Sequence, residues 1–260
     1  YGQSVSYSYD EAGNLSTITY PGNKVVTYTY DASNRLTKVT DWANRVTTYS
    51  YNQGGDLVQI TLPNGTKARY VYDEAGRMVG LQNLTSGGQP IAIYSYTLDK
   101  NGNIISEDAN QPIDPAIQSK TVAYTYGKDN RLLHAGNDAL SYDKNGNLLT
   151  KGATSYQYDH ENRLTRISTS EGAWEYGYDG MGNRLMLRQN GEERRFLIDP
   201  RGMTRVLAEY DGTNTLKAYY VYGLGLLYKV DASDNAYYYH YSFTGNTVAM
   251  TDQNQNIVNK

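Results

Sequence analysis

Apolar and aromatic positions alternate with polar ones in short runs along the chain, and glycine, asparagine or proline interrupts these runs at regular distances. The first runs are Tyr7-Ser-Tyr9 and Leu15 to Ile18, with Gly13 between them. A period of two places every second side chain on the same face of a strand. The pattern therefore predicts many short strands joined by tight turns, with little helix.

The strands form a repeat, marked by a Tyr-x-Tyr unit. It recurs with an unbroken spacing of 21 residues over the first four copies and with looser spacing afterwards. These copies are Tyr7/Tyr9, Tyr28/Tyr30, Tyr49/Tyr51, Tyr70/Tyr72, Tyr94/Tyr96, Tyr124/Tyr126, Tyr156/Tyr158 and Tyr176/Tyr178. A repeat of this length indicates one supersecondary unit used many times.

A turn signal follows the second tyrosine. The turn opens with a residue that is usually Asp and in most copies directly follows this tyrosine. The residue three positions after the opening residue is Gly or Asn in every copy, including the degraded one from Asp99 to Gly102, and these two residues most readily adopt left-handed backbone angles. Asp at the start and a left-handed residue at the end are typical of a type I turn with a G1 bulge. We therefore predict structural turns at Asp10/Gly13, Asp31/Asn34, Asp73/Gly76, Asp143/Gly146, Asp159/Asn162 and Asp179/Gly182.

A second apolar run follows each turn, and a return turn such as Pro21-Gly22-Asn23 leads into the next Tyr-x-Tyr strand. Each repeat is thus an antiparallel hairpin, and the chain is a meander of roughly twenty strands. Open twisted sheets rarely exceed about ten strands, so the meander must curl or close. The insert from Ser106 to Lys120, with Pro112 and Pro115, is expected to be a surface loop.

The chain has 28 Tyr and only 2 Phe among its 260 residues. A buried tyrosine hydroxyl needs a polar partner, which a hydrated surface supplies. The tyrosine rows are therefore expected to face a hydrated interior or a hydrated outer surface, not a dry core.

Charge and cysteine content exclude several function classes. The net charge is -3 and Lys and Arg are scattered singly, so the chain lacks the basic stripe of a nucleic-acid-binding protein, and no nucleic-acid partner is expected. No stretch approaches the roughly 20 apolar residues of a membrane helix, so no membrane insertion is expected. The chain has no cysteine, which excludes disulfides and thiolate metal sites without assigning a compartment.

The motif Tyr9-Asp10-Glu-Ala-Gly13-Asn14-Leu15, repeated through Tyr178-Asp179-Gly-Met-Gly182, resembles the YD repeat of the RHS family. The resemblance covers essentially the whole chain, with regular repeats over about 1–195 and a segment over about 196–260 similar to the start of the RHS-associated core. It implies the spiral β shell of bacterial polymorphic toxins, of the Tc toxin cocoon and of teneurins. In the toxins this shell encapsulates a C-terminal effector that autoproteolysis releases.

The resemblance also implies a single continuous domain over 1–260 that is a fragment of a much larger protein. Tyr1 lies inside a repeat, and another Tyr-x-Tyr-Asp is expected after Lys260. The cleavage segment and the effector are expected outside this chain. The expected partners are the remainder of the parent chain and the encapsulated effector.

Several segments suggest other chemistry, but a structural interpretation is favoured for each. Asp99 and Asp143 open Asp-Lys-Asn-Gly-Asn segments similar to calcium loops, but the glycine is at the fourth position and not the sixth. Asp199-Pro200-Arg-Gly202 could be the family's protease motif, yet it is in register with the turns. Gly223-Leu-Gly225 is expected to be a turn or bulge, not a dinucleotide fingerprint.

A structural interpretation is also favoured for the charged and most of the aromatic candidates. His134, His160 and His240 lack metal-ligand spacing and are expected to be solvated or on a strand face. Glu192-Glu193 followed by Arg194-Arg195 is expected at a charged hairpin end. The run from Tyr237 to Tyr241 could stack on sugars or pack as a ladder.

These observations predict an all-β fold, an antiparallel β-hairpin meander coiled into a spiral shell, tube or large barrel segment. The expected function is that of a structural segment of a secreted or cell-surface bacterial shell, with no catalysis, no cofactor and no metal. The alternative is an adhesion or carbohydrate-binding module that presents tyrosine rows to glycans, and an enzyme is the third hypothesis. Whether the meander closes, covers its edges or oligomerises stays open.

Overall fold

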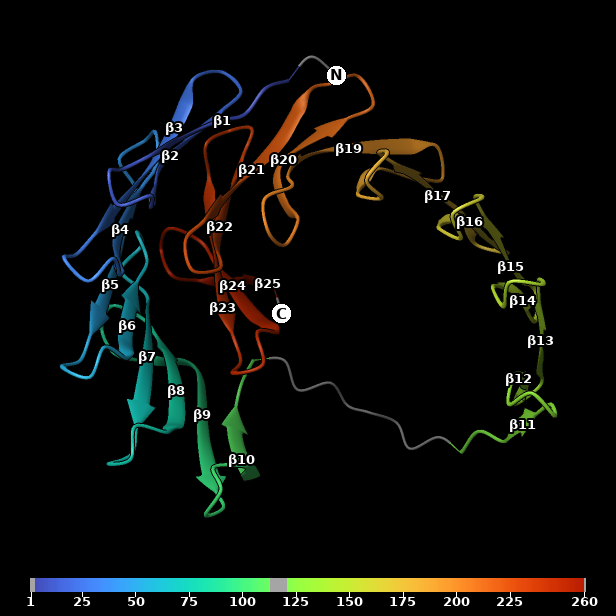
Figure 1. The fold of residues 1–260 in the computed structure, drawn as a ribbon, viewed down its shortest axis with the longest axis horizontal. Coiled ribbons are helices and arrows are strands. Elements are labelled where there is room, and N and C mark those ends of the chain that lie inside the picture. The colour runs from blue at the N-terminus through green and yellow to red at the C-terminus, as the bar shows by residue number, and fades with distance from the viewer. Residues whose placement is uncertain (1–2, 113–120, 260) are drawn as a thin grey trace. The chain divides into compact units, whose positions relative to one another are not determined.

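The computed structural model describes residues 3–112 and 121–259, and within them every regular element is a strand (Figure 1). The first sheet contains β1 (Ser6–Tyr9), β2 (Leu15–Tyr20), β3 (Lys24–Tyr30), β4 (Leu36–Thr40), β5 (Val46–Tyr51), β6 (Leu57–Thr61), β7 (Lys67–Tyr72), β8 (Met78–Leu84), β9 (Pro90–Leu98) and β10 (Ile104–Asn110).

The second sheet contains β11 (Tyr124–Tyr126), β12 (Leu132–Ala135), β13 (Asp138–Tyr142), β14 (Leu148–Lys151), β15 (Thr154–Tyr158), β16 (Leu164–Thr169), β17 (Gly172–Tyr178), β18 (Arg184–Gln189), β19 (Glu192–Asp199), β20 (Arg205–Asp211), β21 (Leu216–Tyr222), β22 (Leu226–Asp231), β23 (Ala236–Tyr241), β24 (Thr247–Thr251) and β25 (Ile257–Asn259). Strand order follows chain order in both sheets. The prediction of an antiparallel hairpin meander is confirmed.

The hairpin register shifts at the second tyrosine of the repeat. Tyr28 lies opposite Val39, but Tyr30 lies opposite Leu36, because β4 has one extra residue, Thr37, opposite the step from Thr29 to Tyr30. The same shift occurs at Tyr51 and Tyr72. This is the bulge that a type I turn followed by a left-handed residue produces.

The loop expected from Ser106 to Lys120 is wrong in its first part. Residues Ser106–Asn110 belong to β10 and pair with Ile93–Thr97 of β9. A strand at the edge of a sheet needs only backbone hydrogen bonds on one side, so its polar side chains can remain exposed. The part of the insert at 113–120 lies outside the described residues.

The chain divides into two compact units, called here unit 1 (residues 1–115 and 218–260) and unit 2 (residues 116–217). Unit 1 has two layers, since β21–β25 lie against one face of the first sheet (Figure 1). The Tyr20 hydroxyl donates to the Tyr220 carbonyl at 2.9 Å, and Asn83 Nδ2 donates to the Tyr241 carbonyl at 2.9 Å. Hydrogen bonds thus join residues more than 150 positions apart.

The core of unit 1 lies between these layers. The first sheet contributes Val26 and Val39, and the second layer contributes Val221, Tyr228 and Val230, all at most 2% exposed. Trp42 packs beside Tyr20 and Tyr219, with ring centroids 5.7 and 5.2 Å away. The second layer thus supplies the apolar surface that the first sheet alone lacks.

The expectation that the tyrosine rows face water is wrong for unit 1. Tyr28, Tyr49 and Tyr94 are at most 8% exposed. Some of these buried hydroxyls find protein partners: Tyr28 donates to the Tyr222 carbonyl at 3.1 Å, and Tyr94 donates to Gln111 Oε1 at 2.7 Å, whereas the Tyr49 hydroxyl has no partner among the described residues. The tyrosine face of unit 1 is dry because the second layer covers it, and that layer also supplies the acceptor for Tyr28.

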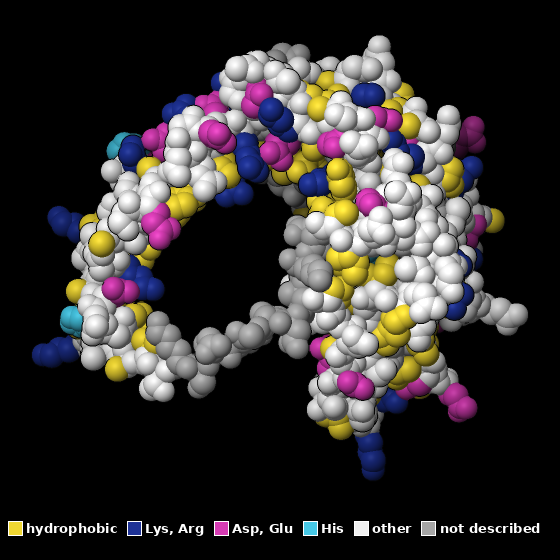
Figure 2. Space-filling model, turned by 180° about the vertical axis from the view of Figure 1, so that it is seen from behind, with side chains coloured by type: hydrophobic (Ala, Val, Ile, Leu, Met, Phe, Trp, Pro, Cys, Tyr) yellow, Lys and Arg dark blue, Asp and Glu magenta, His cyan; other side chains and the backbone are white. Residues whose placement is uncertain are grey.

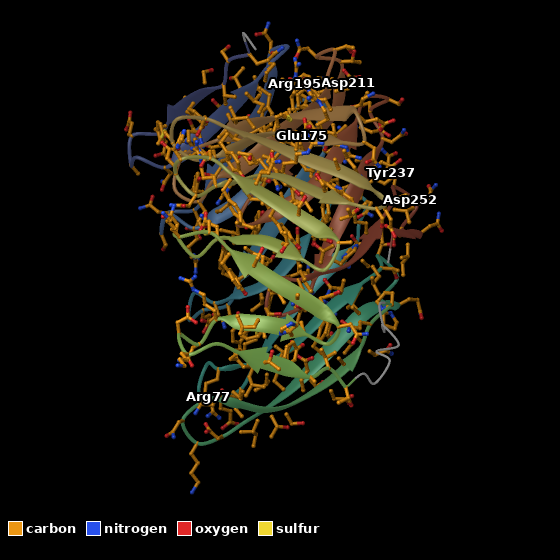
Figure 3. The ribbon with its side chains drawn as sticks, turned by 90° about the vertical axis from the view of Figure 1, so that its right-hand side faces the viewer. Arg77, Glu175, Arg195, Asp211, Tyr237 and Asp252 are labelled. Atoms are coloured by element: carbon orange, nitrogen blue, oxygen red, sulfur yellow. The ribbon has the colours of Figure 1, made fainter. Side chains whose placement is uncertain are left out.

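Unit 2 is different. Between residues 121 and 198 no described side chain is fully buried. Ion pairs cross one face of its sheet from β16 to β19, with Arg166 and Arg188 on Glu175 at 3.0 and 2.9 Å and Arg188 on Glu193 at 2.5 Å. Arg195 extends this row, and Figure 3 marks it together with Glu175. The opposite face carries half-buried rings such as Trp174 and Tyr176.

The surface carries both charge signs. On the face drawn in Figure 2, Lys and Arg side chains are interspersed with Asp and Glu, in keeping with the net charge of -3. The part of the chain that the structure describes contains no helix with the length and apolar composition needed to span a lipid bilayer.

Candidate functional site

The repeated Asp-x-x-Gly turn is the feature with the most polar chemistry. In the first copy the Gly13 N–H donates to the Asp10 carbonyl at 3.0 Å, and the Asp10 N–H donates to the Asn14 carbonyl at 2.9 Å. Gly13 has a φ of 83°, in the left-handed region where glycine is not strained. The Asp10 carboxylate accepts from the Asn14 backbone at 2.8 Å and from its amide at 3.0 Å.

The other predicted turn residues occupy the same geometry. In each copy the N–H of the third residue after Asp donates to the Asp carbonyl at 3.0–3.2 Å. The residues with positive φ are Asn34 (58°), Gly76 (73°), Gly146 (91°), Asn162 (61°) and Gly182 (85°). Their aspartates are Asp31, Asp73, Asp143, Asp159 and Asp179, and each carboxylate accepts from the residue four positions later.

These hydrogen bonds determine the charge state of the turn carboxylates. The side-chain bond from Asn14, Arg77 or Asn183, together with backbone N–H groups, holds the pKa of Asp10, Asp73 and Asp179 below the usual range. Such a carboxylate is a weak base. It serves the turn as an acceptor and is a poor candidate for proton transfer.

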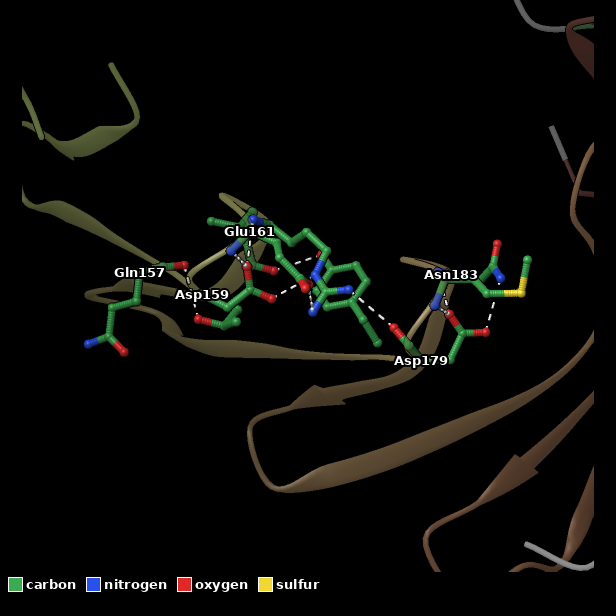
Figure 4. Close-up of polar contacts among 10 residues, drawn as sticks. Gln157, Asp159, Glu161, Asp179 and Asn183 are labelled. Carbon is green, nitrogen blue, oxygen red and sulfur yellow. Dashed lines mark hydrogen bonds and ion pairs between the residues drawn. The ribbon is translucent and has the colours of Figure 1, made fainter. Parts of the chain in front are cut away.

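Long polar side chains connect one turn to the next. Arg163 contacts Asp159 Oδ2 at 2.7 Å, donates to the Asp179 carbonyl at 3.1 Å and lies 5.0 Å from the Tyr178 ring centroid (Figure 4). In unit 1, Arg77 donates to the Asp99 carbonyl at 3.1 Å, and Asn14 donates to Asn34 Oδ1 at 2.9 Å. These contacts run along the sheet from repeat to repeat.

A second link uses the second tyrosine of the repeat, whose hydroxyl donates to a leucine carbonyl that opens a strand of the preceding repeat. The distances are 2.7–3.0 Å for Tyr30 to Leu15, Tyr51 to Leu36, Tyr72 to Leu57, Tyr142 to Leu132, Tyr178 to Leu164 and Tyr241 to Leu226. Sequence reasoning missed this bond. The signal was the constant spacing of 15 residues between Leu and Tyr in the first copies.

The calcium-like segments are turns of the same kind. Asp99 Oδ1 accepts from the Asn101 and Asn103 N–H groups at 2.8 and 2.9 Å, and Asp143 accepts in the same way from Asn145 and Asn147. Within residues 3–112 and 121–259 no cluster of His, Asp or Glu has the composition to hold a metal ion. The carboxylate oxygens are directed at the protein's own backbone.

Asp199 is 3% exposed at the end of β19. Its carboxylate accepts from the Arg201 N–H at 3.1 Å and contacts Arg201 Nη2 at 2.8 Å. Gly202 has a positive φ of 63°. Asp199 thus contacts Arg201, the second residue after it, in the same turn register as the other aspartates.

The three histidines lie apart from one another. His134 contacts Thr125 at 3.0 Å on the exposed β11–β12 hairpin, and His160 is exposed in a turn. His240 is on the buried face of β23, 2% exposed, with Nε2 2.9 Å from Thr251 Oγ1. The solvated alternative is wrong for His240, since it lies on the face of β23 that the first sheet covers, and burial lowers its pKa to about 4.

The remaining candidates take local roles. The Gly223 N–H donates to the Gly225 carbonyl at 2.8 Å in the turn between β21 and β22. A Cβ at Gly223 would overlap the Tyr49 hydroxyl, so this glycine permits close approach of the two layers. Glu192 lies at a hairpin end, but Glu193 and Arg195 belong to the ion-pair row of unit 2.

The run Tyr237–Tyr241 divides between two faces of β23. Tyr238 and His240 are buried in the core, whereas Tyr237, Tyr239 and Tyr241 are partly exposed on the other face. Tyr239 and Tyr241 stack with centroids 6.3 Å apart, and Lys229 Nζ lies 5.3 Å from the Tyr237 ring.

Relatives of known name share part of this sequence. The chain is 30% identical over 139 residues to the tRNA3(Ser)-specific nuclease WapA of Bacillus spizizenii and 29% identical over 147 residues to the tRNA nuclease WapA of Bacillus subtilis. These matches cover 52% and 55% of the chain but only 6% of each relative.

Solved structures share the fold over nearly the whole chain. The Tc holotoxin pore of Photorhabdus luminescens superposes with a TM-score of 0.66 at 14% identity, covering 98% of this chain and 17% of that one. A TcdB2-TccC3 crystal structure gives a TM-score of 0.67 at 14% identity, covering 98% and 18%. The profile of the family described as Teneurin YD-shell matches residues 2–91 and 81–260, and the resemblance to YD-repeat proteins is thereby confirmed. With this repeat over its whole length, the chain belongs to the teneurin YD-shell family.

Proposed function

We propose that this chain is a wall segment of a secreted or cell-surface shell that encloses or presents a cargo domain, and that the segment itself catalyses no reaction. One observation carries the proposal: the polar groups of the repeat bind one another. Turn carboxylates accept from their own backbone, and tyrosine hydroxyls and arginines such as Arg163 reach the neighbouring repeat.

The mechanism would be steric. Hydrogen bonds between strands run along the meander, and the turn contacts add a second set of bonds at the strand ends. A wall of this kind keeps a cargo away from its target without a reactive group. The partners would be the rest of the parent chain and the enclosed effector.

The names of the relatives suggest what such a cargo could be. The WapA proteins are named as tRNA nucleases, and this chain matches 6% of their length. We place any comparable activity of the parent outside this segment. The isolated chain should therefore leave tRNA intact, with and without added Mg²⁺, and cleavage that scales with chain concentration would overturn the non-catalytic proposal.

Protection of the cargo tests the shell directly. In the full-length parent, the domain after the shell should resist a protease that degrades the same domain when produced alone. Leu81→Asp, in the core of unit 1, should weaken the wall and shorten this protection, whereas Met181→Asp, at a position 82% exposed, should not. Equal cleavage of the cargo in all forms would contradict enclosure.

Carbohydrate contact is a second candidate, favoured by the partly exposed and stacked rings of Tyr239 and Tyr241. Aromatic faces with polar tips suit sugar rings. A saccharide titration followed by NMR should then perturb residues of β23 and lose its effect in Tyr239→Ala. Unchanged spectra across a panel of saccharides would remove this candidate.

A further inference from the structure

Unit 1 contains a cavity of about 460 Å³ between its two layers. The first sheet lines it with apolar side chains from β6 to β8, and the turns around β22 to β24 line it from the opposite layer. The principal apolar contributors are Ile60, Leu62, Ala68, Leu81, Leu226 and Phe243. Volume and lining are in the range of small-molecule sites, which hold about 300–1,000 Å³.

The cavity lies where a regular feature of the repeat is interrupted. In two successive repeats of the first sheet, the first tyrosine reaches the second layer: Tyr28 donates to the Tyr222 carbonyl at 3.1 Å, and Tyr49 is buried where its hydroxyl faces Gly223. Tyr70 is next in this series and lines the cavity. Within residues 3–112 and 121–259 the structure gives its hydroxyl no hydrogen-bond partner.

Asn83 supplies a second polar group. It is 1% exposed, lines the cavity and donates its amide N–H to the Tyr241 carbonyl at 2.9 Å. Its amide oxygen has no donor among the described residues. Both residues line the cavity, and an amide oxygen and a phenol hydroxyl without protein partners favour a ligand that can bond them.

The lining also determines the charge of a ligand. No Lys, Arg, Asp or Glu is among the described lining residues. The His240 Nε2 atom already has a hydrogen-bond partner, Thr251 Oγ1, at 2.9 Å. An ion in this cavity would lose hydration without compensation. At the open side, Leu224 and Phe243 are 55% and 46% exposed, so the entrance is apolar as well.

We propose that this cavity binds a small, uncharged, largely apolar molecule with one hydroxyl or amide group. Its apolar body would lie among Ile60, Leu62 and Leu81, and its polar group would bond Tyr70 and Asn83. The proposal does not depend on the shell function, because it rests on unit 1 alone.

The test is calorimetric titration of the intact chain with 2-naphthol, with naphthalene and 2-naphthoate for comparison. We expect saturable binding of 2-naphthol, at least ten-fold weaker binding of the anionic 2-naphthoate, and about five-fold weaker binding of naphthalene, which lacks the hydroxyl. Methyl NMR signals of Ala68 and Leu81 should shift on titration.

Two variants, each with a matched control variant, locate the site. Ala68→Phe fills the cavity and should abolish binding, whereas Val71→Phe places the same ring on β7 at a position 41% exposed and outside the cavity, and should leave binding unchanged. Tyr70→Phe keeps the shape and should remove the preference for 2-naphthol over naphthalene. Tyr156→Phe, at the equivalent tyrosine of a repeat in unit 2, should keep that preference.

Three outcomes would overturn the proposal. They are no saturable binding of 2-naphthol, binding that survives Ala68→Phe in a folded protein, and equal binding of 2-naphthol and 2-naphthoate. Binding of a leucine-rich peptide in place of 2-naphthol would identify the occupant as a chain segment and would also contradict the small-molecule proposal.

Discussion

Unit 1 and unit 2 use the same two-strand repeat, yet only one of them has a dry core through most of its length. The difference is clear at equivalent positions. Leu81 lies opposite Tyr70 and is 3% exposed, whereas Leu187 lies opposite Tyr176 in the same register and is only half-buried. The repeat thus determines strands, turns and register, while burial depends on whether a second layer covers the tyrosine face.

The two units also differ in what stabilises their sheets. Unit 1 has apolar packing between layers, such as the cluster of Leu81 and Tyr94 in the first sheet with Val248 in the second layer. Unit 2 has a row of ion pairs around Glu175 and Arg188 on partly exposed side chains. Exposed ion pairs contribute little individually, so turn bonds such as those of Asp159 and the tyrosine bonds of Tyr142 and Tyr178 carry more of the stability of unit 2.

The largest expected effect comes from the matched leucines. Leu81→Ala should lower the free energy of unfolding of unit 1 by about 3 kcal/mol, because it removes buried apolar contacts with the core cluster and enlarges the adjoining cavity. Leu187→Ala should cost unit 2 about 1 kcal/mol, because its side chain is already partly solvated.

Each unit contains one tryptophan, which allows separate measurement. Urea unfolding is followed by Trp42 fluorescence in a Trp174→Phe background for unit 1, and by Trp174 fluorescence in a Trp42→Phe background for unit 2. Equal losses for the two leucine variants would mean that the layers of unit 1 do not form a cohesive core in solution.

The next effect is a pH dependence confined to unit 1. Burial lowers the pKa of His240 to about 4 from an ordinary value of 6.5, so folding favours its neutral form. The contribution of neutral His240 to the free energy of unfolding of unit 1 is present above pH 6.5 and is lost as the pH falls from 6.5 toward 4. By linkage, unit 1 should lose about 2 kcal/mol between pH 7 and pH 5.

The same fluorescence assay at pH 7 and pH 5 checks this expectation. His240→Asn should remove most of the difference, whatever its effect on stability at pH 7. Unit 2 has no buried histidine among its described residues, so its stability should hardly change over this range. A loss of the same size in unit 2 would show that another group is responsible.

The sequence allowed the local structure to be predicted because its causes are local. A period of two fixes which side chains share a face, and Asp followed by Gly or Asn three positions later fixes the turn, as at Asp10 and Gly13. What covers a face is decided elsewhere in the chain. Tyr28 is buried by β21, nearly 200 residues away, and no pattern around Tyr28 reports that contact.

The polar links and the cavity were harder to foresee for a related reason. The tyrosine-to-leucine bond, such as Tyr51 to Leu36, requires the exact offset between adjacent repeats. The cavity at Tyr70 depends on where a turn of the second layer ends. The bond and the cavity both depend on how segments of similar sequence are aligned with one another in the folded chain.

A smaller effect, equal in the two units, is expected at the left-handed turn glycines. Gly76 in unit 1 and Gly146 in unit 2 have φ of 73° and 91°, and a Cβ at either position would meet no atom within 4 Å. Alanine there should cost about 1 kcal/mol through backbone strain alone.

Gly180 is the control, because it also lies in a turn with open space around it but without a positive φ. Gly180→Ala should be neutral or slightly stabilising. Unfolding by urea, monitored separately for each unit, measures all three variants. A cost at Gly146 as small as that at Gly180 would contradict the turn geometry assigned to the repeat.

The smallest effect is expected from the hydroxyls that join neighbouring repeats. Tyr51 donates to Leu36 at 2.8 Å in unit 1, and Tyr178 donates to Leu164 at 2.7 Å in unit 2. Tyr51→Phe and Tyr178→Phe should each lower the free energy of unfolding by at most about 1 kcal/mol, the usual net value of one hydrogen bond. The control is Tyr126→Phe, at a position 61% exposed, which should leave the free energy of unfolding unchanged. Equal costs at Tyr51 and Tyr178 would show that this bond belongs to the repeat itself. A cost at Tyr51 alone would instead assign it to the second layer of unit 1.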